Sequence, residues 1–197
     1  MKLVVGLGNP GARYEQTRHN VGFQVIDELT RRWHVDQWRN EHQALVAKVR
    51  LGGDALLVAK PMTFMNLSGE AVSGLAGFYK LNVADVLVVL DEVALPLGRL
   101  RASRGGSAGG HNGLKSVIAR LGTSDVPRLR IGVGVGDGRR PLVDHVLGAF
   151  AEDERGQVEA AVLRAADAAV MFVTEGIERV MNAFNAANDK QDPEAVG

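Results

Sequence analysis

The sequence predicts an α/β protein, a single domain with a central mixed, mostly parallel twisted sheet and helices on its faces. Short apolar runs typical of strands alternate along the chain with longer segments whose apolar residues recur at helical spacing, without an internal repeat or a linker. With 197 residues, 46% of them hydrophobic, the chain suits one substantial core and is too short for two ordinary domains. We therefore assign residues 1–187 to the domain and 188–197 to a polar C-terminal tail, which we expect to be frayed.

The first half of the chain is expected to contain three strands and two helices. In order, the sequence predicts a strand at 2–7, a helix at 20–33, a pair of strands at 45–51 and 55–59, and a helix at 68–79. Asn20 has a side chain that suits the N-cap of the first helix. Gly52, Gly53 and Asp54 are expected to form a hairpin turn within the strand pair.

The second half continues the alternation. The sequence predicts strands at 86–90, 100–104 and 128–135, a helix at 111–121, and two closing helices at about 152–174 and 177–187. The run at 86–90 is entirely apolar, which is typical of a strand buried on both faces. A cluster of four glycines within residues 105–110 suits either a flexible surface loop or a gate whose backbone N–H groups approach a large polar substrate.

The composition and the motifs argue against several kinds of functional site and of targeting segment. The absence of cysteine excludes a disulfide framework, a thiolate metal site and a cysteine nucleophile. The histidines lack a zinc-ligand spacing such as HExxH, which argues against a metal site. No apolar run approaches the roughly 20 residues of a membrane span, and Gly8, Asn9 and Pro10 interrupt the N-terminal apolar run too early for a signal peptide. We expect a cytoplasmic protein without a membrane partner.

The net charge of zero hides an uneven distribution along the chain. Residues 99–140 contain nine basic residues and two acidic ones, whereas residues 141–197 contain four basic and eleven acidic residues. A local basic segment suits a nucleic-acid-binding face even when the whole chain is neutral. Charge alone leaves the alternative open that this segment is only solvated surface.

Polar side chains are expected to gather where the predicted strands end, because ligands of open α/β sheets bind at the carboxyl ends of the strands. Asn9 follows the first strand, Asp91 follows the apolar strand in the middle of the chain, and His19 precedes the first helix. Asn66 and Asn112 can reach the same edge if their loops fold over the sheet. Taken alone, each asparagine also suits a turn or a helix cap.

These groups suit the hydrolysis of an ester. A neutral imidazole such as His19 can take a proton from water, and a carboxylate such as Asp91 on its second nitrogen fixes the tautomer and stabilises the imidazolium. Asparagine amides can orient a water, a carbonyl or a developing oxyanion. The alternative for His19 is a structural histidine at the entry to a helix.

Two glycine motifs point to other classes of protein. Gly6, Gly8 and Gly11 spell the GxGxxG of dinucleotide-binding proteins, but the helical pattern begins only near Asn20, so the match is weak. A GxSxG centred on Ser107 suggests a serine hydrolase, although the segment before it, LRASR, is charged where a nucleophile elbow follows an apolar strand.

The serine hydrolase is the second interpretation, with His145 as a possible triad member. A third is an RNA-binding protein of the same fold without activity, against which the intact set of His19, Asp91 and three asparagines argues.

Four stretches together closely resemble one family: VVGLGNPGARYEQTRHNVGF (4–23), KPMTFMNLSGEAV (60–72), LDEVALPLG (90–98) and GGSAGGHNGLKSV (105–117). The chain resembles the bacterial peptidyl-tRNA hydrolases from Lys2 to about Ala187, in the family's order and spacing. The resemblance implies a monomeric α/β enzyme that hydrolyses the ester between a peptide and the 3′-terminal ribose of tRNA. It implies no metal or organic cofactor.

The resemblance also assigns roles to residues of this chain. His19 is implied to be the catalytic base, and Asp91 to orient it and raise its basicity. Asn9 would contact the peptide, whereas Asn66 and Asn112 would hold the water, the substrate carbonyl or the terminal nucleotide. The residues implied to line the cleft are Tyr14, Phe64, Met65 and His111. For the aromatic and methionine side chains, packing in the core is the alternative.

The implied partner is peptidyl-tRNA, and phosphate binding rests on lysine and arginine rather than on the net charge of the whole chain. Arg130 matches a basic position that the family uses for phosphate contact. Ser103 stands where the family often has a basic residue, and Arg101 or Arg104 would replace that contact.

Overall fold

The computed structural model describes residues 1–51, 53–136, 138 and 141–186. Its strands are β1 (Lys2–Gly6), β2 (Arg39–Glu41), β3 (Ala44–Leu51), β4 (Asp54–Pro61), β5 (Val86–Glu92), β6 (Leu100–Ser103) and β7 (Arg128–Gly132). Its helices are α1 (Val21–Arg32), α2 (Ser68–Phe78), α3 (Asn112–Leu121), α4 (Leu142–Val146), α5 (Glu152–Glu175) and α6 (Ile177–Val180). Short turns of 3-10 helix are η1 (Ala12–Tyr14), η2 (Arg18–Asn20), η3 (Met65–Leu67) and η4 (Val83–Asp85), and η5 (Met181–Asn185) is π-helical.

Some sequence predictions fall outside the described residues. They concern Gly52 of the hairpin turn, three charged residues of the basic segment (Asp137, Arg139 and Arg140), the end of the last helix at 187, and the tail at 188–197. In the part of the chain that is described, no helix combines the length and the apolar content needed to cross a membrane.

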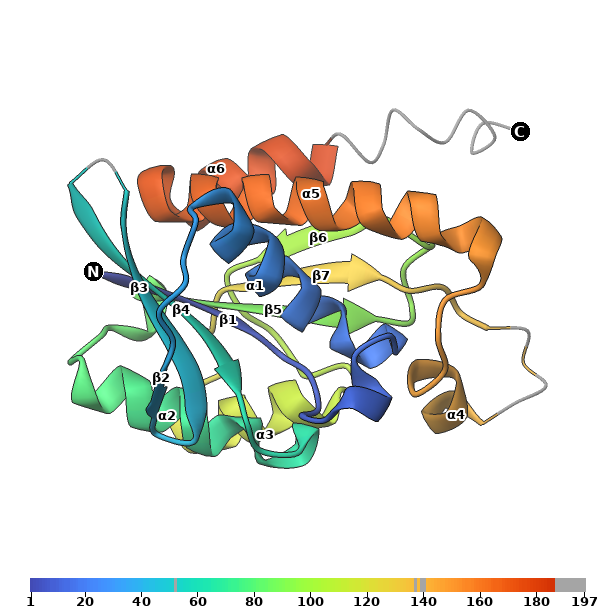
Figure 1. The fold of residues 1–197 in the computed structure, drawn as a ribbon, viewed down its shortest axis with the longest axis horizontal. Helices are drawn as coiled ribbons and strands as arrows, with labels where there is room; N and C mark the ends of the chain where they lie inside the picture. Colours follow the sequence, from blue (N-terminus) through green and yellow to red (C-terminus); the bar gives the residue numbers. More distant parts are fainter. Residues whose placement is uncertain (52, 137, 139–140, 187–197) are drawn as a thin grey trace.

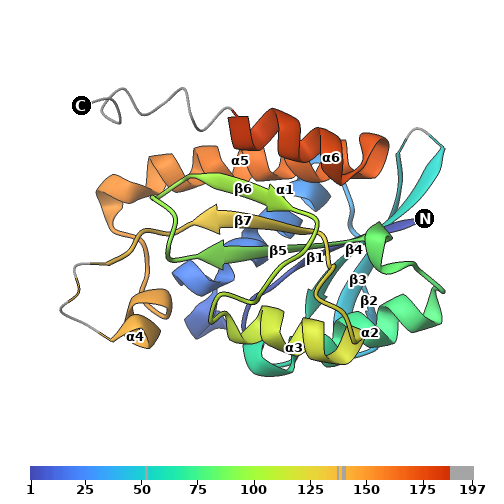
Figure 2. The same cartoon turned by 180° about the vertical axis from the view of Figure 1, so that it is seen from behind.

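The described strands form a seven-stranded sheet in the order β2-β3-β4-β1-β5-β7-β6. The four central strands, β4, β1, β5 and β7, are parallel to one another, whereas β2, β3 and β6 are antiparallel to their neighbours. In Figures 1 and 2, α1, α5 and α6 cover one face of the sheet, and α2 and α3 cover the other. The predicted α/β fold with a mixed, mostly parallel sheet is confirmed.

The central strands are apolar throughout because they contribute to a core on each face of the sheet. On β1, Leu3 and Val5 pack in the core under α2 and α3, whereas Val4 packs in the core under α1 and α5. All three side chains are fully buried. Burial on both faces explains why the sequence shows a continuous apolar run here rather than an alternation.

Two short elements were not predicted. β2 is a three-residue strand at the edge of the sheet, and its polar sequence Arg-Asn-Glu lacks the apolar pattern of a buried strand. α4 has only five residues, and its Leu142 and Val143 are exposed rather than packed in the core. Elements that bury little surface leave little periodicity in the sequence.

Three predicted details differ in part from the structure. The strand predicted at 128–135 ends at Gly132, whose backbone packs so closely on a neighbouring turn that a Cβ would lie 1.9 Å from the carbonyl oxygen of Pro96. The helix predicted at 177–187 is α-helical only to Val180 and continues as the π-helical η5. Asn20 is the N-cap residue of α1, as predicted, but its side chain makes no capping hydrogen bond and binds the backbone of Asn9 instead.

Two glycines of the GxGxxG motif, Gly6 and Gly8, make room for α1. A Cβ on Gly6 would lie 2.1 Å from the carbonyl oxygen of Gly22, and a Cβ on Gly8 would lie 2.7 Å from the ring of Phe23. The start of α1 therefore packs directly on the backbone of β1. Through this contact the turn η2, which precedes α1, lies at the carboxyl end of the strand.

Candidate active site

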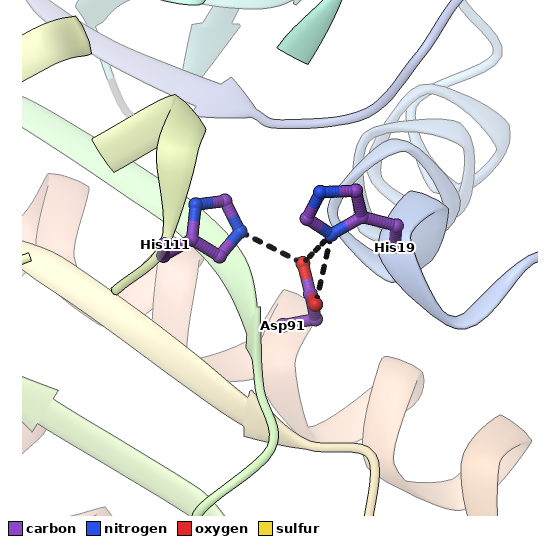
Figure 3. Close-up of side chains that lie close together, drawn as sticks. All are labelled: His19, Asp91 and His111. Atoms are coloured by element: carbon purple, nitrogen blue, oxygen red, sulfur yellow. Dashed lines mark hydrogen bonds and ion pairs between the residues drawn. The ribbon is translucent and has the colours of Figure 1, made fainter. Parts of the chain in front are cut away.

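A cluster of polar side chains lies at the carboxyl edge of the parallel strands (Figure 3). Asp91 lies near the end of β5, His19 lies in η2, and His111 lies immediately before α3. Three separate parts of the chain therefore meet at one point. This is the position that the rule for open α/β sheets predicts for a ligand site.

Both imidazole rings hydrogen-bond the carboxylate of Asp91 (Figure 3). Nδ1 of His19 lies 2.8 Å from Oδ1 and 2.9 Å from Oδ2 of Asp91, and Nε2 of His111 lies 2.9 Å from Oδ1. The carboxylate is 2% exposed, so these ring contacts replace its hydration. The predicted contact between His19 and Asp91 is confirmed. The second histidine on the same carboxylate was not predicted.

The hydrogen bonds decide which ring nitrogen carries the proton. Nδ1 of His111 accepts the backbone N–H of Leu114 at 3.2 Å, so Nε2 of the neutral ring carries the proton and donates to Asp91. Nδ1 of His19 also donates to Asp91, because an ionised carboxylate only accepts. Nε2 of His19 therefore keeps its lone pair, and no described residue hydrogen-bonds it. The geometry suits His19 to the role of a base.

Asp91 remains ionised at this site. Burial pushes the pKa of Asp91 upward, but the two rings, His111 foremost, outweigh burial and hold the pKa well below its ordinary value. A permanent negative charge behind His19 stabilises the imidazolium that forms when Nε2 takes a proton.

Asn9 is fixed by its neighbours at the end of β1. Its backbone N–H donates to Oδ1 of Asn20 at 2.9 Å, and Nδ2 of Asn20 donates back to the carbonyl oxygen of Asn9 at 2.9 Å. Oδ1 of Asn9 accepts the backbone N–H of Met65 at 2.8 Å. Within the described residues, Nδ2 of Asn9 has no hydrogen-bond partner, so it is the group that remains for a ligand. The sequence assigned Asn20 only a capping role and missed this one.

Asn66 and Asn112 line one shallow depression of about 390 Å³. The two segments that carry them are in contact, because Met65 packs its sulfur against Gly113, where a Cβ would lie 2.5 Å away. Asn112 also lines a pocket of about 130 Å³ that contains His19. The structure therefore brings the five polar residues predicted from the sequence to neighbouring positions at one edge of the sheet.

The other residues expected to line the cleft occupy different environments. The side chain of Met65 is 5% exposed and belongs to the core under α2 and α3. Phe64 is 55% exposed and can contact a ligand. The ring of Tyr14 packs against the guanidinium of Arg13, which lies 4.5 Å from the ring centroid. Both ring nitrogens of His111 are already hydrogen-bonded, one to Asp91 and the other to the backbone N–H of Leu114 at the start of α3.

A buried arginine holds the turn that carries His19. The guanidinium of Arg18 donates to both carboxylate oxygens of Glu154, at 2.7 and 3.2 Å, and to the carbonyl oxygen of Val133 at 3.1 Å. Its hydrogen bond also lowers the pKa of Glu154. The sequence analysis missed Arg18, although its place next to the candidate histidine in TRHN is a usable signal.

Two arginines of β7 hold the backbone of the glycine cluster (residues 105–110) by hydrogen bonds. Arg128 is fully buried and donates to the carbonyl oxygens of Gly106, Ser107 and Ser124 at 2.7, 3.0 and 2.7 Å. Arg130 adds a second donor to Ser107 at 3.1 Å. Burial and the neighbouring Arg130 lower the pKa of Arg128 to about 10, so it stays charged at neutral pH. These bonds argue against a freely flexible loop.

The structure does not form the catalytic pair of a serine hydrolase. The side chain of Ser107 makes no hydrogen bond to a described residue, and its carbonyl oxygen is bound by arginines. Nε2 of His145 hydrogen-bonds the carbonyl oxygen of Gly134 at 2.8 Å. This nitrogen is therefore not free to accept the proton of a serine nucleophile, as the histidine of a triad does.

The three arginines expected to bind phosphate differ in their surroundings. Arg101 is exposed and lies directly opposite Arg130 in the pairing of β6 with β7. Arg130 lies 3.2 Å from a carboxylate oxygen of Glu92, and burial and Arg101 lower its pKa. Arg104 forms an exposed ion pair with Glu178. Arg101 and Arg130 therefore lie side by side in a strip of β6 and β7 in which Arg130 is paired with Glu92, and Arg104 is paired with Glu178.

The central cluster also has the composition of a metal site. The candidate ligand atoms of His19, Asp91 and His111 lie within 4.8 Å of one another. However, the nitrogens of both rings that face Asp91 carry the protons of its hydrogen bonds, so a metal would have to displace both. The donor set fits the hydrogen-bonded arrangement better than a metal.

Comparison with known proteins places the geometry in context. A family model described as peptidyl-tRNA hydrolase matches residues 3–193. The peptidyl-tRNA hydrolase of Geobacillus kaustophilus (strain HTA426) is 50% identical over 185 residues, which cover 94% of this chain and all of the relative. That of Brevibacillus brevis is 45% identical over 186 residues, covering 94% and 98%. The crystal structure of peptidyl-tRNA hydrolase from Acinetobacter baumannii matches with a TM-score of 0.88 at 32% identity, covering 94% of this chain and 95% of that one.

Proposed function

This chain belongs to the bacterial peptidyl-tRNA hydrolase family, and on that premise we propose that His19 activates the water that hydrolyses the ester between a peptide and the 3′-terminal ribose of tRNA. The observation that carries the proposal is the hydrogen-bonded pair of His19, which is partly exposed, and Asp91, which is buried. The pair presents Nε2 of His19 without a proton in a pocket of about 130 Å³.

The proposed reaction needs only groups of this chain, water and the substrate. Nε2 of His19 takes a proton from water while the water oxygen bonds to the ester carbonyl carbon, and the carbonyl oxygen takes up the displaced electron pair. The tetrahedral intermediate collapses as the bond to the ribose oxygen breaks. The imidazolium returns its proton to that oxygen, which yields the free peptide and a tRNA with a free ribose hydroxyl. Asp91 stabilises the imidazolium between the two steps.

The asparagines supply the neutral polar contacts of the reaction. Nδ2 of Asn9 is the amide donor that its neighbours leave unused, and we assign it to the peptide. Asn66 and Asn112 are exposed on either side of the adjacent depression and are assigned to the water, the carbonyl or the terminal nucleotide. A donor that is already positioned stabilises a developing oxyanion without reorganising.

The apolar side of the pocket is assigned to the peptide. Leu142, Val143 and Val146 of α4 border the pocket that contains His19. The first two are 54% and 62% exposed, although they are large apolar side chains. Exposed apolar groups beside a polar site suit contact with substrate side chains.

Ser107→Ala separates water activation from a serine nucleophile. Peptide release from an N-blocked aminoacyl-tRNA is expected to keep kcat within about twofold of the unchanged protein, because Ser107 lacks a histidine partner. The measurement is kcat and KM for release of the blocked amino acid under multiple turnover. A loss of more than about 100-fold, toward the roughly 10⁶-fold that removal of a serine nucleophile can cause, would favour the serine hydrolase instead.

Arg101→Gln tests the phosphate contacts proposed for Arg101, Arg104 and Arg130. Arg101 is the exposed member of the strip, and its loss is expected to raise KM for full-length substrate uniformly across tRNAs and to reduce the slope of log KM against log salt by about 1. Arg50→Gln, an exposed arginine on β3 at the far side of the sheet, is the matched control. Identical salt slopes in the two variants would show that the strip is only solvated surface.

A further inference from the structure

Arg18, the residue before the proposed base, binds both ends of the connection between β7 and α5. Val133 comes directly after β7, and its carbonyl oxygen accepts a hydrogen bond from Nη1 of Arg18 at 3.1 Å. Gly148 lies shortly before α5, and its carbonyl oxygen accepts the backbone N–H of Arg18 at 3.0 Å. Thr17 and Ala149 continue this second contact as an isolated antiparallel bridge. The two ends of the connection that carries α4 are therefore held at one residue of η2.

The guanidinium of Arg18 is fixed in one orientation. Arg18 is 8% exposed, and its two Nη atoms donate to the two carboxylate oxygens of Glu154 at 3.2 and 2.7 Å. The guanidinium carbon also lies 4.8 Å from the centroid of the Phe150 ring. Oε2 of Glu154 accepts the backbone N–H of Ala151 at 2.7 Å, which fixes the carboxylate in turn. A bidentate pair specifies geometry as well as contributing energy, so a shift of η2 would break a largely buried contact.

α4 is attached to the same part of the structure and borders the pocket of the proposed base. Nε2 of His145, on α4, donates to the carbonyl oxygen of Gly134 at 2.8 Å, one residue after the carbonyl that Arg18 binds. α4 also packs directly against η2. Val146 of α4 and His19 of η2 line the same pocket of about 130 Å³. The apolar border of the pocket and the base are therefore placed by contacts that meet at Arg18.

We propose that Arg18 is a positioning residue, which holds the base His19 and the apolar border on α4 in one fixed relation; this inference rests on the proposed function. A peptide side chain that contacts α4 then brings the ester carbonyl carbon to the water at Nε2 of His19. Arg18 is not among the residues that line the pocket, so it acts through these neighbours. A misplacement of about 1 Å can cost a reaction about 10²-fold, so a contact outside the pocket can control the rate.

Glu154→Gln tests the proposal without removing Arg18, because the amide keeps the shape of the side chain but loses its charge and one acceptor oxygen. The change is expected to lower kcat for hydrolysis of N-acetyl-leucyl-tRNA by about 10-fold. It is also expected to weaken the hydrogen bond from Nδ1 of His19 to Asp91, which would move the resonance of that proton upfield in the NMR spectrum.

Glu28→Gln is the matched control. Glu28 also accepts two hydrogen bonds from one guanidinium, that of Arg31, but the pair lies toward the far end of α1 from η2. This variant is expected to keep kcat within about twofold and to leave the His19 resonance in place. The free energy of unfolding is measured for both variants, so that kcat is compared between folded proteins. A folded Glu154→Gln variant that behaves like the control would overturn the inference.

A double-mutant cycle tests the link between α4 and the base. Val143 is 62% exposed on α4, so Val143→Ala is expected to lower kcat/KM for N-acetyl-leucyl-tRNA by about 5-fold. In the Glu154→Gln background the same change is expected to cost less than about twofold, because contact with α4 no longer places the ester at the base. Effects that multiply independently would also overturn the inference. If the unchanged protein released no N-acetyl-leucine, the proposed function itself would fail.

Discussion

Replacing His19 with alanine is expected to lower kcat for peptide release by about 10²- to 10⁴-fold, the usual contribution of a positioned general base. Nε2 of His19 is the unprotonated ring nitrogen that the hydrogen bonds of the cluster leave toward the pocket. The second ring cannot replace it, because Nδ1 of His111 accepts the N–H of Leu114 and Nε2 faces Asp91. KM is expected to change by less than about threefold, because the lost interaction acts mainly in the transition state.

Two measurements accompany the His19→Ala variant. Binding of deacylated tRNA is expected to be unchanged, since His19 is not among the residues assigned to the nucleic acid. The free energy of unfolding reports whether the turn η2 survives, which is expected because Arg18 still holds that turn to Glu154. A folded variant that binds tRNA and retains kcat within tenfold of the unchanged protein would exclude His19 as the base.

The fold was predictable where burial leaves a pattern in the sequence. The central strands are apolar on both faces because helices cover both, and α1 shows the helical spacing of one buried face. β2 and α4 bury too little surface to leave such a pattern. The end of β7 at Gly132 depends on a contact with Pro96, more than thirty positions away, which local periodicity does not contain.

The positions of the candidate site residues were predictable from the sequence, whereas the hydrogen bonds between them were less so. The strand-end rule and the family resemblance both indicated His19 and Asp91, and the structure joins them. From the sequence, His111 was expected only to line the cleft. Its hydrogen bond to Asp91 requires α3 to begin beside β5, and the sequence does not show that arrangement. Met65 is a similar case, since its side chain belongs to the core and its backbone N–H holds Asn9.

Asp91→Asn is the second change expected to have a large effect, a loss of about 10²- to 10⁴-fold in kcat. The amide keeps the shape of the carboxylate but offers one acceptor oxygen and an NH₂ group. His111 must face the oxygen, because its Nδ1 is bound to Leu114 and its Nε2 carries the proton. The NH₂ group then faces Nδ1 of His19, 2.9 Å from the position of Oδ2.

In this position the NH₂ group repels a proton on Nδ1 of His19, so we expect the other tautomer, in which Nδ1 accepts from the amide and Nε2 carries the proton, even though the amide oxygen stays 2.8 Å from Nδ1. A base in that form has no lone pair on the side of the pocket, so the loss in kcat follows from the position of one hydrogen and not only from the missing charge.

The readout that isolates this cause is the pair of ¹⁵N chemical shifts of the His19 ring, which are expected to exchange their assignments between the unchanged protein and Asp91→Asn. The free energy of unfolding of Asp91→Asn must be measured at the same time, because the carboxylate of Asp91 also contributes to stability. The folded state lowers the pKa of Asp91, so the carboxylate stabilises the protein above its unfolded pKa and loses that contribution as pH falls through the folded value. If the variant is folded and its His19 keeps the proton on Nδ1, or if kcat falls less than tenfold, Asp91 does not set the tautomer of the base.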